Sequence, residues 1–172
     1  VREDLDKDDS QLIIWYKFNK EDFTSNYASL QDKTLEGNPS IFQSEYYVGT
    51  GSAEINNELH YKIQMSGGEF NSQRYTFCFW LFLNEEYIGD KFILNLQDTS
   101  TGSIDLFNFK YNTGRLIIHK NSTIIEYNCI LDKKKWHHIS IILDDTDSSN
   151  KIILLVNGIK INTSSSFNDV FL

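Results

Sequence analysis

The sequence predicts an all-β protein in which two antiparallel sheets form a jelly-roll sandwich. Short runs rich in β-branched and aromatic residues recur along the 172-residue chain, and turn residues separate them at regular spacing. No stretch has the apolar period of a useful amphipathic helix. The chain holds 12 Phe, 9 Tyr and 3 Trp, and this aromatic content suits packed strands.

The clearest strands lie between residues 136 and 161. The run 139–143 is almost entirely apolar and β-branched, and a second such run covers 152–156. Asn157-Gly158 then separates two apolar segments, which predicts a type I′ hairpin because both central residues of that turn need positive φ. We therefore expect three short strands joined by two turns here.

Residues 75–83 predict a central strand, because both of its alternating faces are apolar and would be covered on both sides. Residues 56–73 read as irregular. Further strands are expected at 12–18, 91–96, 103–110, 115–119 and 123–129, with shorter candidates at 28–30, 34–36, 41–48 and 52–55. The side chains that we expect in the core are Trp15, Trp80, Trp136, Phe77, Phe79, Ile139, Ile141, Leu154 and Val156.

Charge and length limit the possible domain organisation and the possible partners. Residues 1–10 are a charged run, expected as a flexible lead-in, and residues 11–172 are expected to form one domain of a larger protein. The net charge of −8 argues against a nucleic-acid partner. The basic run 133–135 is interpreted as a solvated turn. No apolar run approaches the ~20 residues needed to span a membrane.

Cys78 and Cys129 leave two alternatives open. They are two small buried apolar residues, or they form a single disulfide in an oxidising compartment. Asn121 and Asn162 each begin a glycosylation sequon, which is compatible with secretion.

Four motifs in fixed order carry a family resemblance: the segment 12–18 (LIIWYKF), the segment 75–80 (YTFCFW), Trp-His-His-Ile at 136–139 and Leu-Val-Asn-Gly at 155–158. Together they resemble the laminin-G-like branch of the concanavalin-A-like lectin/glucanase superfamily over roughly residues 12–161. The chain departs from that pattern after the hairpin, where only 162–172 remain for a closing strand. Asp169 is the one acidic residue there, so the calcium site of the related pentraxins is not reproduced.

Catalysis is not expected. The glucanases of this superfamily carry a Glu-x-Asp-x-(x)-Glu strand, whereas the nearest spacing here, Glu54 to Glu58, lacks the central Asp. His137 and His138 are neighbours on a strand, so they point to opposite faces and cannot chelate one ion. We expect one to pack by Trp136 and the other to face solvent, with no Ser or Cys nucleophile nearby in the sequence.

The resemblance implies calcium as a candidate cofactor, because relatives bind it through acidic residues at the rim of the two sheets. Asp98 and Asp105 flank the loop 97–103, and with Thr99 and Asn95 they offer the hard oxygen ligands that calcium takes. The competing interpretation, ordinary polar turn residues, is favoured.

The expected function is non-catalytic, carbohydrate-binding or adhesive recognition in a secreted or surface protein. A lectin-like module would bind a glycan or an extracellular protein through its rim loops or concave sheet face, with the exposed Tyr and Asn of 19–73 as a source of contacts. The alternatives are a spacer that contacts other domains of its parent chain, and a divergent glycosidase.

Overall fold

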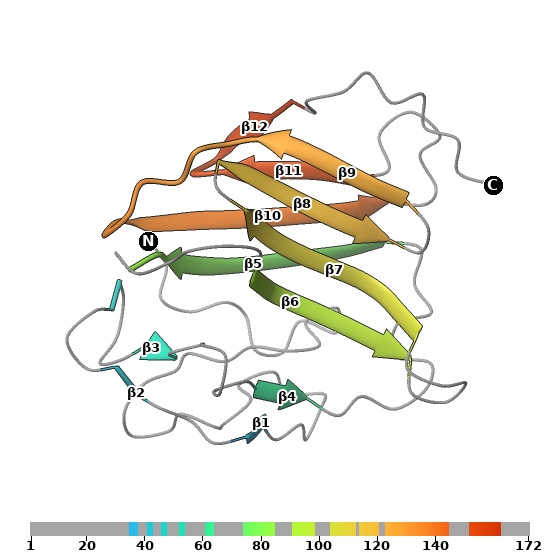
Figure 1. Cartoon of the computed structure of the whole chain (residues 1–172), viewed down its shortest axis with the longest axis horizontal. Helices are drawn as coiled ribbons and strands as arrows, with labels where there is room; N and C mark the ends of the chain where they lie inside the picture. Colours follow the sequence, from blue (N-terminus) through green and yellow to red (C-terminus); the bar gives the residue numbers. More distant parts are fainter. Residues whose placement is uncertain are drawn as a thin grey trace. The chain divides into compact units, whose positions relative to one another are not determined.

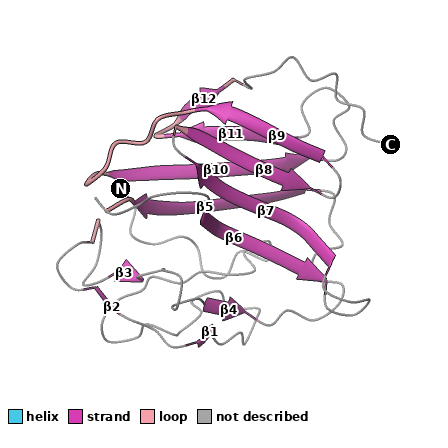
Figure 2. Ribbon diagram, viewed as in Figure 1, coloured by secondary structure: helices cyan, strands magenta, loops and turns pink. Residues whose placement is uncertain are grey.

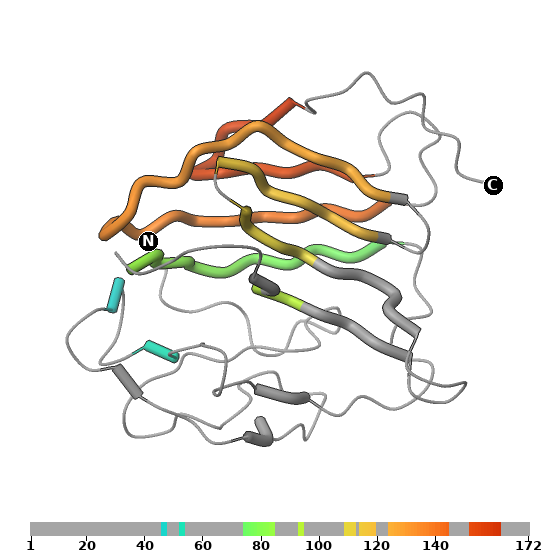
Figure 3. The backbone as a smooth tube through the Cα atoms, in the orientation of Figure 1, coloured from blue at the N-terminus to red at the C-terminus, as the bar shows by residue number. Residues whose placement is uncertain are grey.

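A computed structural model describes the backbone of residues 35–37, 41–42, 46–47, 52–53, 61–63, 74–84, 91–98, 104–112, 114–120, 123–144 and 152–162. Side chains are described for the coloured part of the tube in Figure 3, which excludes 91–92, 95–98 and 104–108 among others. The predicted strand 12–18, with Trp15, lies outside the described residues. The chain divides into two compact units, Val1–Glu69 and Phe70–Leu172.

Two short antiparallel pairs are described in the first unit. Strand β1 (Leu35–Gly37) pairs with β4 (Tyr61–Ile63), and β2 (Ile41–Phe42) pairs with β3 (Ser52–Ala53). Strand β4 falls in the stretch 56–73, so the expectation that all of this stretch is irregular is wrong. The local sequence of β4 has only a weak strand signal, and β4 forms because it pairs with the distant strand β1.

The second unit contains two four-stranded antiparallel sheets (Figure 1), which confirms the all-β prediction for the described residues. The first sheet has the order β12-β11-β10-β5, from β5 (Arg74–Phe82), β10 (Trp136–Asp144), β11 (Ile152–Val156) and β12 (Ile159–Ile161). The second is a meander of β6 (Lys91–Asp98), β7 (Ile104–Asn112), β8 (Arg115–Lys120) and β9 (Thr123–Asn128). Every regular element of the described residues is a strand (Figure 2).

Strand β10 shows how alternation in the sequence becomes a buried side of a sheet. Its residues alternate between half-buried and buried along the whole strand. Ile139 and Ile141 are fully buried, and the register places Ile139 between Phe79 of β5 and Val156 of β11. Because side chains in a strand point alternately to its two faces, one face of this sheet is apolar and inward.

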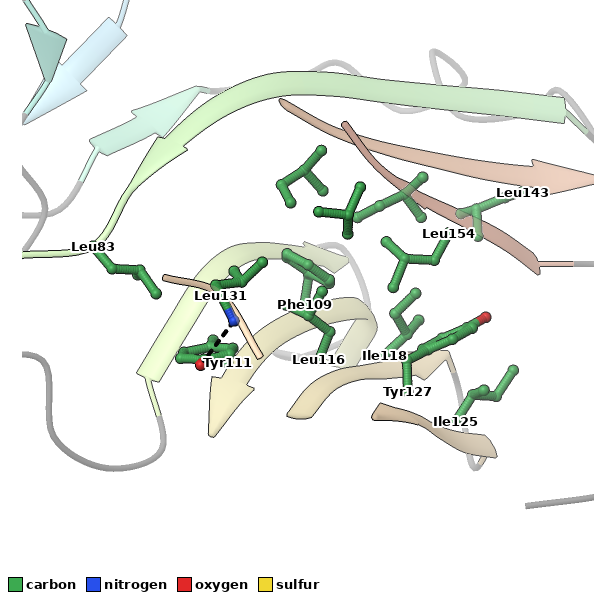
Figure 4. Close-up of a cluster of buried hydrophobic side chains, with 13 residues drawn as sticks. Leu83, Phe109, Tyr111, Leu116, Ile118, Ile125, Tyr127, Leu131, Leu143 and Leu154 are labelled. Carbon is green, nitrogen blue, oxygen red and sulfur yellow. Dashed lines mark hydrogen bonds between the residues drawn. The ribbon is translucent and has the colours of Figure 1, made fainter. Parts of the chain in front are cut away.

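Both sheets contribute to one hydrophobic core (Figure 4). Phe79 of the first sheet meets Phe109 of the second edge-on, with ring centroids 6.0 Å apart. Such edge-to-face pairs add to the free energy gained by apolar burial. The buried members from the two sheets and their connections are Leu83, Phe109, Tyr111, Leu116, Ile118, Ile125, Tyr127, Leu131, Ile139, Ile141, Leu143, Leu154 and Val156.

The predicted core is confirmed for the inward positions and wrong for two tryptophans. Ile139, Ile141, Leu154 and Val156 are buried, and Phe77 and Phe79 pack against the cluster. Trp80 and Trp136 are only half-buried. Each is one residue out of phase with the inward series of its strand, so it lies on the other side of the sheet.

The prediction that β5 is covered on both faces is wrong, because the residues that alternate with its inward series lie on a partly exposed face. Thr76 and Cys78 are exposed, and β10 is the one partner of β5 among the described strands. The hairpin prediction is confirmed, because Asn157 has φ 52° and Gly158 has φ 78° between the paired residues Val156 and Ile159.

Candidate functional site

Three connections of the second unit form what we call the clasped rim: the turn at Gly114 and Arg115, the loop 129–135, and the Asn157-Gly158 hairpin. The loop 129–135 leads from β9 to β10 and is drawn in orange at the left of Figure 1. A network of hydrogen bonds ties these connections to strands of both sheets. The rim is therefore a fixed platform built from segments far apart in the sequence.

The buried Tyr111 holds the first two connections together. Its hydroxyl oxygen accepts hydrogen bonds from the backbone N–H of Gly114 and of Leu131, each at 3.3 Å, and Figure 4 draws the second of these. The N–H of Cys129 also donates to the carbonyl of Gly114 at 2.9 Å. Gly114 has φ 84°, a conformation that glycine adopts without strain.

His137 joins the loop to the hairpin, and apart from the tyrosines it is the one buried residue with a polar side chain in the described part. Its Nε2 lies 3.0 Å from the carbonyl oxygen of Asp132, and its Nδ1 lies 3.4 Å from Nδ2 of Asn157. A carbonyl only accepts, so Nε2 carries the proton, while the amide nitrogen donates to Nδ1. Asn157 is oriented by His138, whose N–H donates to Oδ1 at 2.9 Å. In this arrangement Nε2 of His137 donates to the loop and Nδ1 accepts from the hairpin.

The exposed part of the loop is strongly charged. Lys134 has φ 56°, and its N–H donates to the carbonyl of Leu83 at 2.8 Å. Lys135 pairs with Asp132 at 2.7 Å. The hydrogen bond from Lys135, followed by the positive charge of Lys135, lowers the pKa of the Asp132 carboxyl. Residues 132–135 are all exposed.

An open hollow of about 540 Å³ lies at the rim, lined by Gly114, Arg115, Asn128, Cys129 and Ile130. The Ile130 side chain is 82% exposed. Arg115 forms an ion pair with Glu126 at 2.9 Å. Burial raises the pKa of the Cys129 thiol, so this wall of the hollow presents a neutral sulfhydryl.

A second feature is the aromatic face, formed by Trp80, Phe82, Trp136 and His138 on the side of β5 and β10 away from the core. Trp80 and His138 meet edge-on with ring centroids 5.0 Å apart. Phe82 and Trp136 are tilted at 5.2 Å. Aromatic rings on a sheet face are suited to contact with apolar surfaces of a ligand.

Next to these rings lies a chain of long polar contacts. The Cys78 thiol contacts the Ser140 hydroxyl at 3.5 Å, and that oxygen lies 3.5 Å from Nδ1 of His138. The expectation that no Ser or Cys lies near the histidines is therefore wrong, because Ser140 follows His138 by two residues and shares its face of β10. The separation of His137 and His138 onto opposite faces is seen, and His138 packs on Trp80. The expectation that one of them faces solvent is wrong, because His137 is buried and His138 is half-buried.

Cys78 and Cys129 are both free thiols in this structure. Cys78 is exposed on the outer side of β5, whereas Cys129 follows β9 in the other sheet and packs against the core. The expectation that both cysteines are buried is wrong for Cys78, again because of the two-residue period of β5.

The predicted calcium ligands lie on neighbouring strands. The register pairs Asn95 with Asn108, Asp105 with Gln97, and Asp98 with Ile104. Strand β6 runs to Asp98, so that residue belongs to the strand rather than to a loop. Their side chains, and Thr99, are outside the described part. No group of three or more metal-binding side chains occurs where side chains are described, so the calcium set stays a prediction.

Of the two sequon asparagines, Asn162 is exposed just after β12, and Asn121 lies outside the described residues. In the part of the chain that the structure covers, no helix has the length and apolar character needed to cross a membrane.

Compared with family models, with curated proteins and with solved structures, the chain matches none of them. The laminin-G-like resemblance therefore rests on the ordered motifs. Two of those motifs, Trp-His-His and Val-Asn-Gly, are joined in space through His137, His138 and Asn157.

Proposed function

We propose that this chain is a non-catalytic recognition module of a secreted or surface protein, and that it binds a protein ligand at the clasped rim. The two sheets would serve as a concanavalin-A-like jelly-roll scaffold of laminin-G-like type. The observation that carries the proposal is the exposed Ile130 beside an open hollow, on a loop whose backbone is fixed at several points.

The fixed backbone matters more than the exposed side chain. A single exposed isoleucine is ordinary on a protein surface. Here, however, the backbone N–H groups of Leu131 and Lys134 donate to the Tyr111 hydroxyl and to the Leu83 carbonyl. The carbonyl of Asp132 accepts a hydrogen bond from His137. A preorganised loop loses little conformational entropy when it binds, which leaves more of the contact energy as affinity.

The aromatic face supports a second candidate function, recognition of a glycan. Trp80, Phe82 and Trp136 offer rings for stacking on sugars, and His138 and Ser140 offer partners for hydroxyl groups. In this proposal calcium at Asp98, Asp105 and Asn95 would act as an accessory ligand. The spacer and the divergent glycosidase are the remaining alternatives.

Variants matched in chemistry separate these functions. The purified chain would be screened against a peptide display library and a glycan array, alongside Ile130→Ser for the rim and Trp80→Ala for the aromatic face. Ile124→Ser is the control, because Ile124 is also exposed but lies near the other end of β9. All variants would first be checked for an unchanged unfolding midpoint.

Peptide binding that Ile130→Ser weakens and Ile124→Ser leaves intact would support recognition at the rim. Glycan binding that only Trp80→Ala removes would favour the second candidate. Absence of any selected ligand would favour a spacer. Hydrolysis of a β-glucan panel that is lost on replacing Glu54 or Glu58 would favour the glycosidase.

A further inference from the structure

We infer that the contact between His137 and Asn157 is a proton-operated clasp, closed while the imidazole is neutral and opened when the ring takes up a proton. Opening releases the Asn157-Gly158 hairpin from the ring and leaves the loop 129–135 in place. Such a clasp is a property of the chain without ligand, so it does not depend on recognition at the rim.

The hydrogen bonds around His137 assign a different role to each ring nitrogen. Nε2 lies 3.0 Å from the backbone carbonyl oxygen of Asp132, which only accepts, so this nitrogen carries a proton. Nδ1 lies 3.4 Å from the amide nitrogen Nδ2 of Asn157, which only donates, so Nδ1 supplies a lone pair. The residue is 6% exposed, and solvent can therefore hardly replace either partner.

The Asn157 amide cannot adapt to a protonated ring by turning over. Its Oδ1 already accepts the backbone N–H of His138 at 2.9 Å. An imidazolium carries N–H groups at both nitrogens, so its Nδ1–H would face the NH₂ group of Asn157. Turning the amide by half a turn would satisfy Nδ1–H but set the NH₂ group against the His138 N–H. Either arrangement leaves a donor facing a donor at a part-buried contact, and protonation therefore opens the clasp.

Charged groups reach the ring of His137 from the loop. The Asp132 carboxylate attracts a charged ring, and the Lys135 ammonium pairs with that carboxylate at 2.7 Å. Lys133 and Lys134 are the other charges of the loop. The hydrogen bond between Asp132 and the ring runs from Nε2 to the backbone carbonyl, so it gives Nδ1–H no acceptor. The acidic neighbour therefore favours uptake of the proton without replacing the contact that the proton breaks.

The other sides of the rim also bear titratable groups. The second sheet contributes the Tyr111 hydroxyl, and it leads into Cys129, whose thiol stays neutral because burial raises its pKa. Strand β5 places Leu81 opposite His137 in the register, and the hairpin supplies the Asn157 amide, neither of which titrates. Histidine is the side chain that ordinarily changes charge between about pH 5 and 8, so mild acid acts on this contact through the ring of His137.

Protonation should release only one side of the ring. The bond from Nε2–H to the Asp132 carbonyl survives, because a charged ring donates more strongly. The loop also keeps its backbone bonds at Leu131 and Lys134, which do not involve the ring. The hairpin, in contrast, loses its bond to Nδ1, and with it the orientation of the Asn157 amide that serves the His138 N–H.

The test follows the full chain, without ligand, by NMR while the pH is lowered from about 8 to about 5. Long-range ¹H–¹⁵N spectra report protonation of His137, while the backbone amide of His138 and the side-chain NH₂ of Asn157 report the clasp. The most informative variant is Asn157→Asp. Asp-Gly also suits the hairpin turn, and a carboxylate accepts from both Nδ1–H and the His138 N–H.

Two further variants separate the histidines. His137→Gln removes the titrating ring. His138→Gln is the control, because it keeps the backbone N–H that donates to Asn157 and removes the ring that packs on Trp80.

We expect the His138 amide and the Asn157 NH₂ signals to shift with the same midpoint as the His137 ring, while the amides of Leu131 and Lys134 stay in place. Asn157→Asp should raise the midpoint pH of the ring titration by about 1 or more, because an opposite charge favours the imidazolium. It should also keep the His138 amide bonded in acid. His137→Gln should abolish the response, and His138→Gln should retain it.

Signals of the His138 amide and the Asn157 NH₂ that stay unchanged through the ring titration would overturn the inference. So would a ring that stays neutral down to about pH 5, an Asn157→Asp titration at or below the wild-type midpoint, or an equal acid response in His137→Gln. Failure of the clasp would leave recognition at the rim untouched, whereas absence of any rim ligand would leave the clasp intact.

Discussion

The amide of Asn157 and the imidazole of His137 form the contact that fixes the clasped rim. Nδ2 of Asn157 lies 3.4 Å from Nδ1 of His137, while Nε2 of His137 reaches the carbonyl of Asp132 at 3.0 Å. The backbone N–H of Asn157 also donates to the carbonyl of His138 at 2.8 Å. One buried ring thereby connects the loop 129–135 to a hairpin about twenty residues further along the chain.

Replacing Asn157 by glycine should lower the free energy of unfolding by about 1–2 kcal/mol. Glycine tolerates the φ of 52° at this position, so the loss reports the side-chain hydrogen bonds to His137 and to the His138 N–H. Urea unfolding followed by tryptophan fluorescence measures it. Gly158→Ala is the control for backbone strain. Nothing lies within 4 Å of the added Cβ, so its loss of stability reports only the strain of alanine at a φ of 78°. An unchanged stability in Asn157→Gly would show that these bonds contribute nothing.

Truncating Ile141 to alanine should cost about 2–5 kcal/mol, because it is fully buried at the centre of the shared core and its removal leaves a cavity. The exposed Ile124, replaced in the same way, should cost far less. Thermal or urea unfolding of the two variants makes the comparison. Equal losses would contradict a core that includes the inward face of β10.

Iodoacetamide should modify Cys78 well before Cys129. Cys78 is exposed, whereas burial raises the pKa of Cys129, so at about pH 7.5 very little of the reactive thiolate forms there. The folded state favours the neutral thiol of Cys129. Its contribution to the free energy of unfolding is therefore present below the ordinary pKa of 9.0, and it is lost as the pH rises through the pKa of the folded state. Mass spectrometry of timed samples gives both rates, with Cys78→Ser isolating Cys129. Faster labelling at Cys129 would refute its burial.

The Asp132 carboxyl should titrate below its ordinary value of 3.8, because Lys135 donates a hydrogen bond to it. A lowered folded pKa means that the pair contributes stability above 3.8 and that the contribution is lost as pH falls through the folded value. Carboxyl NMR across the acid range measures the titration. Lys135→Met should return it toward the ordinary value, and a wild-type titration at or above that value would contradict the ion pair.

Much of the second unit was predictable because its signals are local. The β-branched residues of 139–143 and 152–156 predicted strands, and Asn157-Gly158 predicted the hairpin turn that follows the second of them. Phe77, Phe79, Ile139 and Ile141 were expected at the core and lie there, but alternation alone did not tell the inward face of β5 or β10 from the outer one. The short strand β4 was not predictable, because its pairing with the distant β1 is what orders it.

The positions of Trp80 and Trp136 show where composition misleads. A large aromatic residue is expected in the core, but the phase of each strand was already set by Phe79 and Ile139, which left the tryptophans on the other face. The candidate site was missed for a related reason. The lysines at 133–135 were interpreted as a solvated turn and Ile130 carried no signal of its own. The tertiary hydrogen bonds of Tyr111 and His137 are what fix the loop around them.

The most direct test of recognition at the clasped rim is an NMR footprint. A peptide selected by display on the folded chain would be titrated into ¹⁵N-labelled protein, and the amide shifts would be followed. The account predicts changes concentrated at Gly114, Arg115 and residues 129–135, with the amides of Thr76 and Cys78 unmoved. Changes centred on the outer face of β5, or a footprint unaltered by Ile130→Ser, would contradict it.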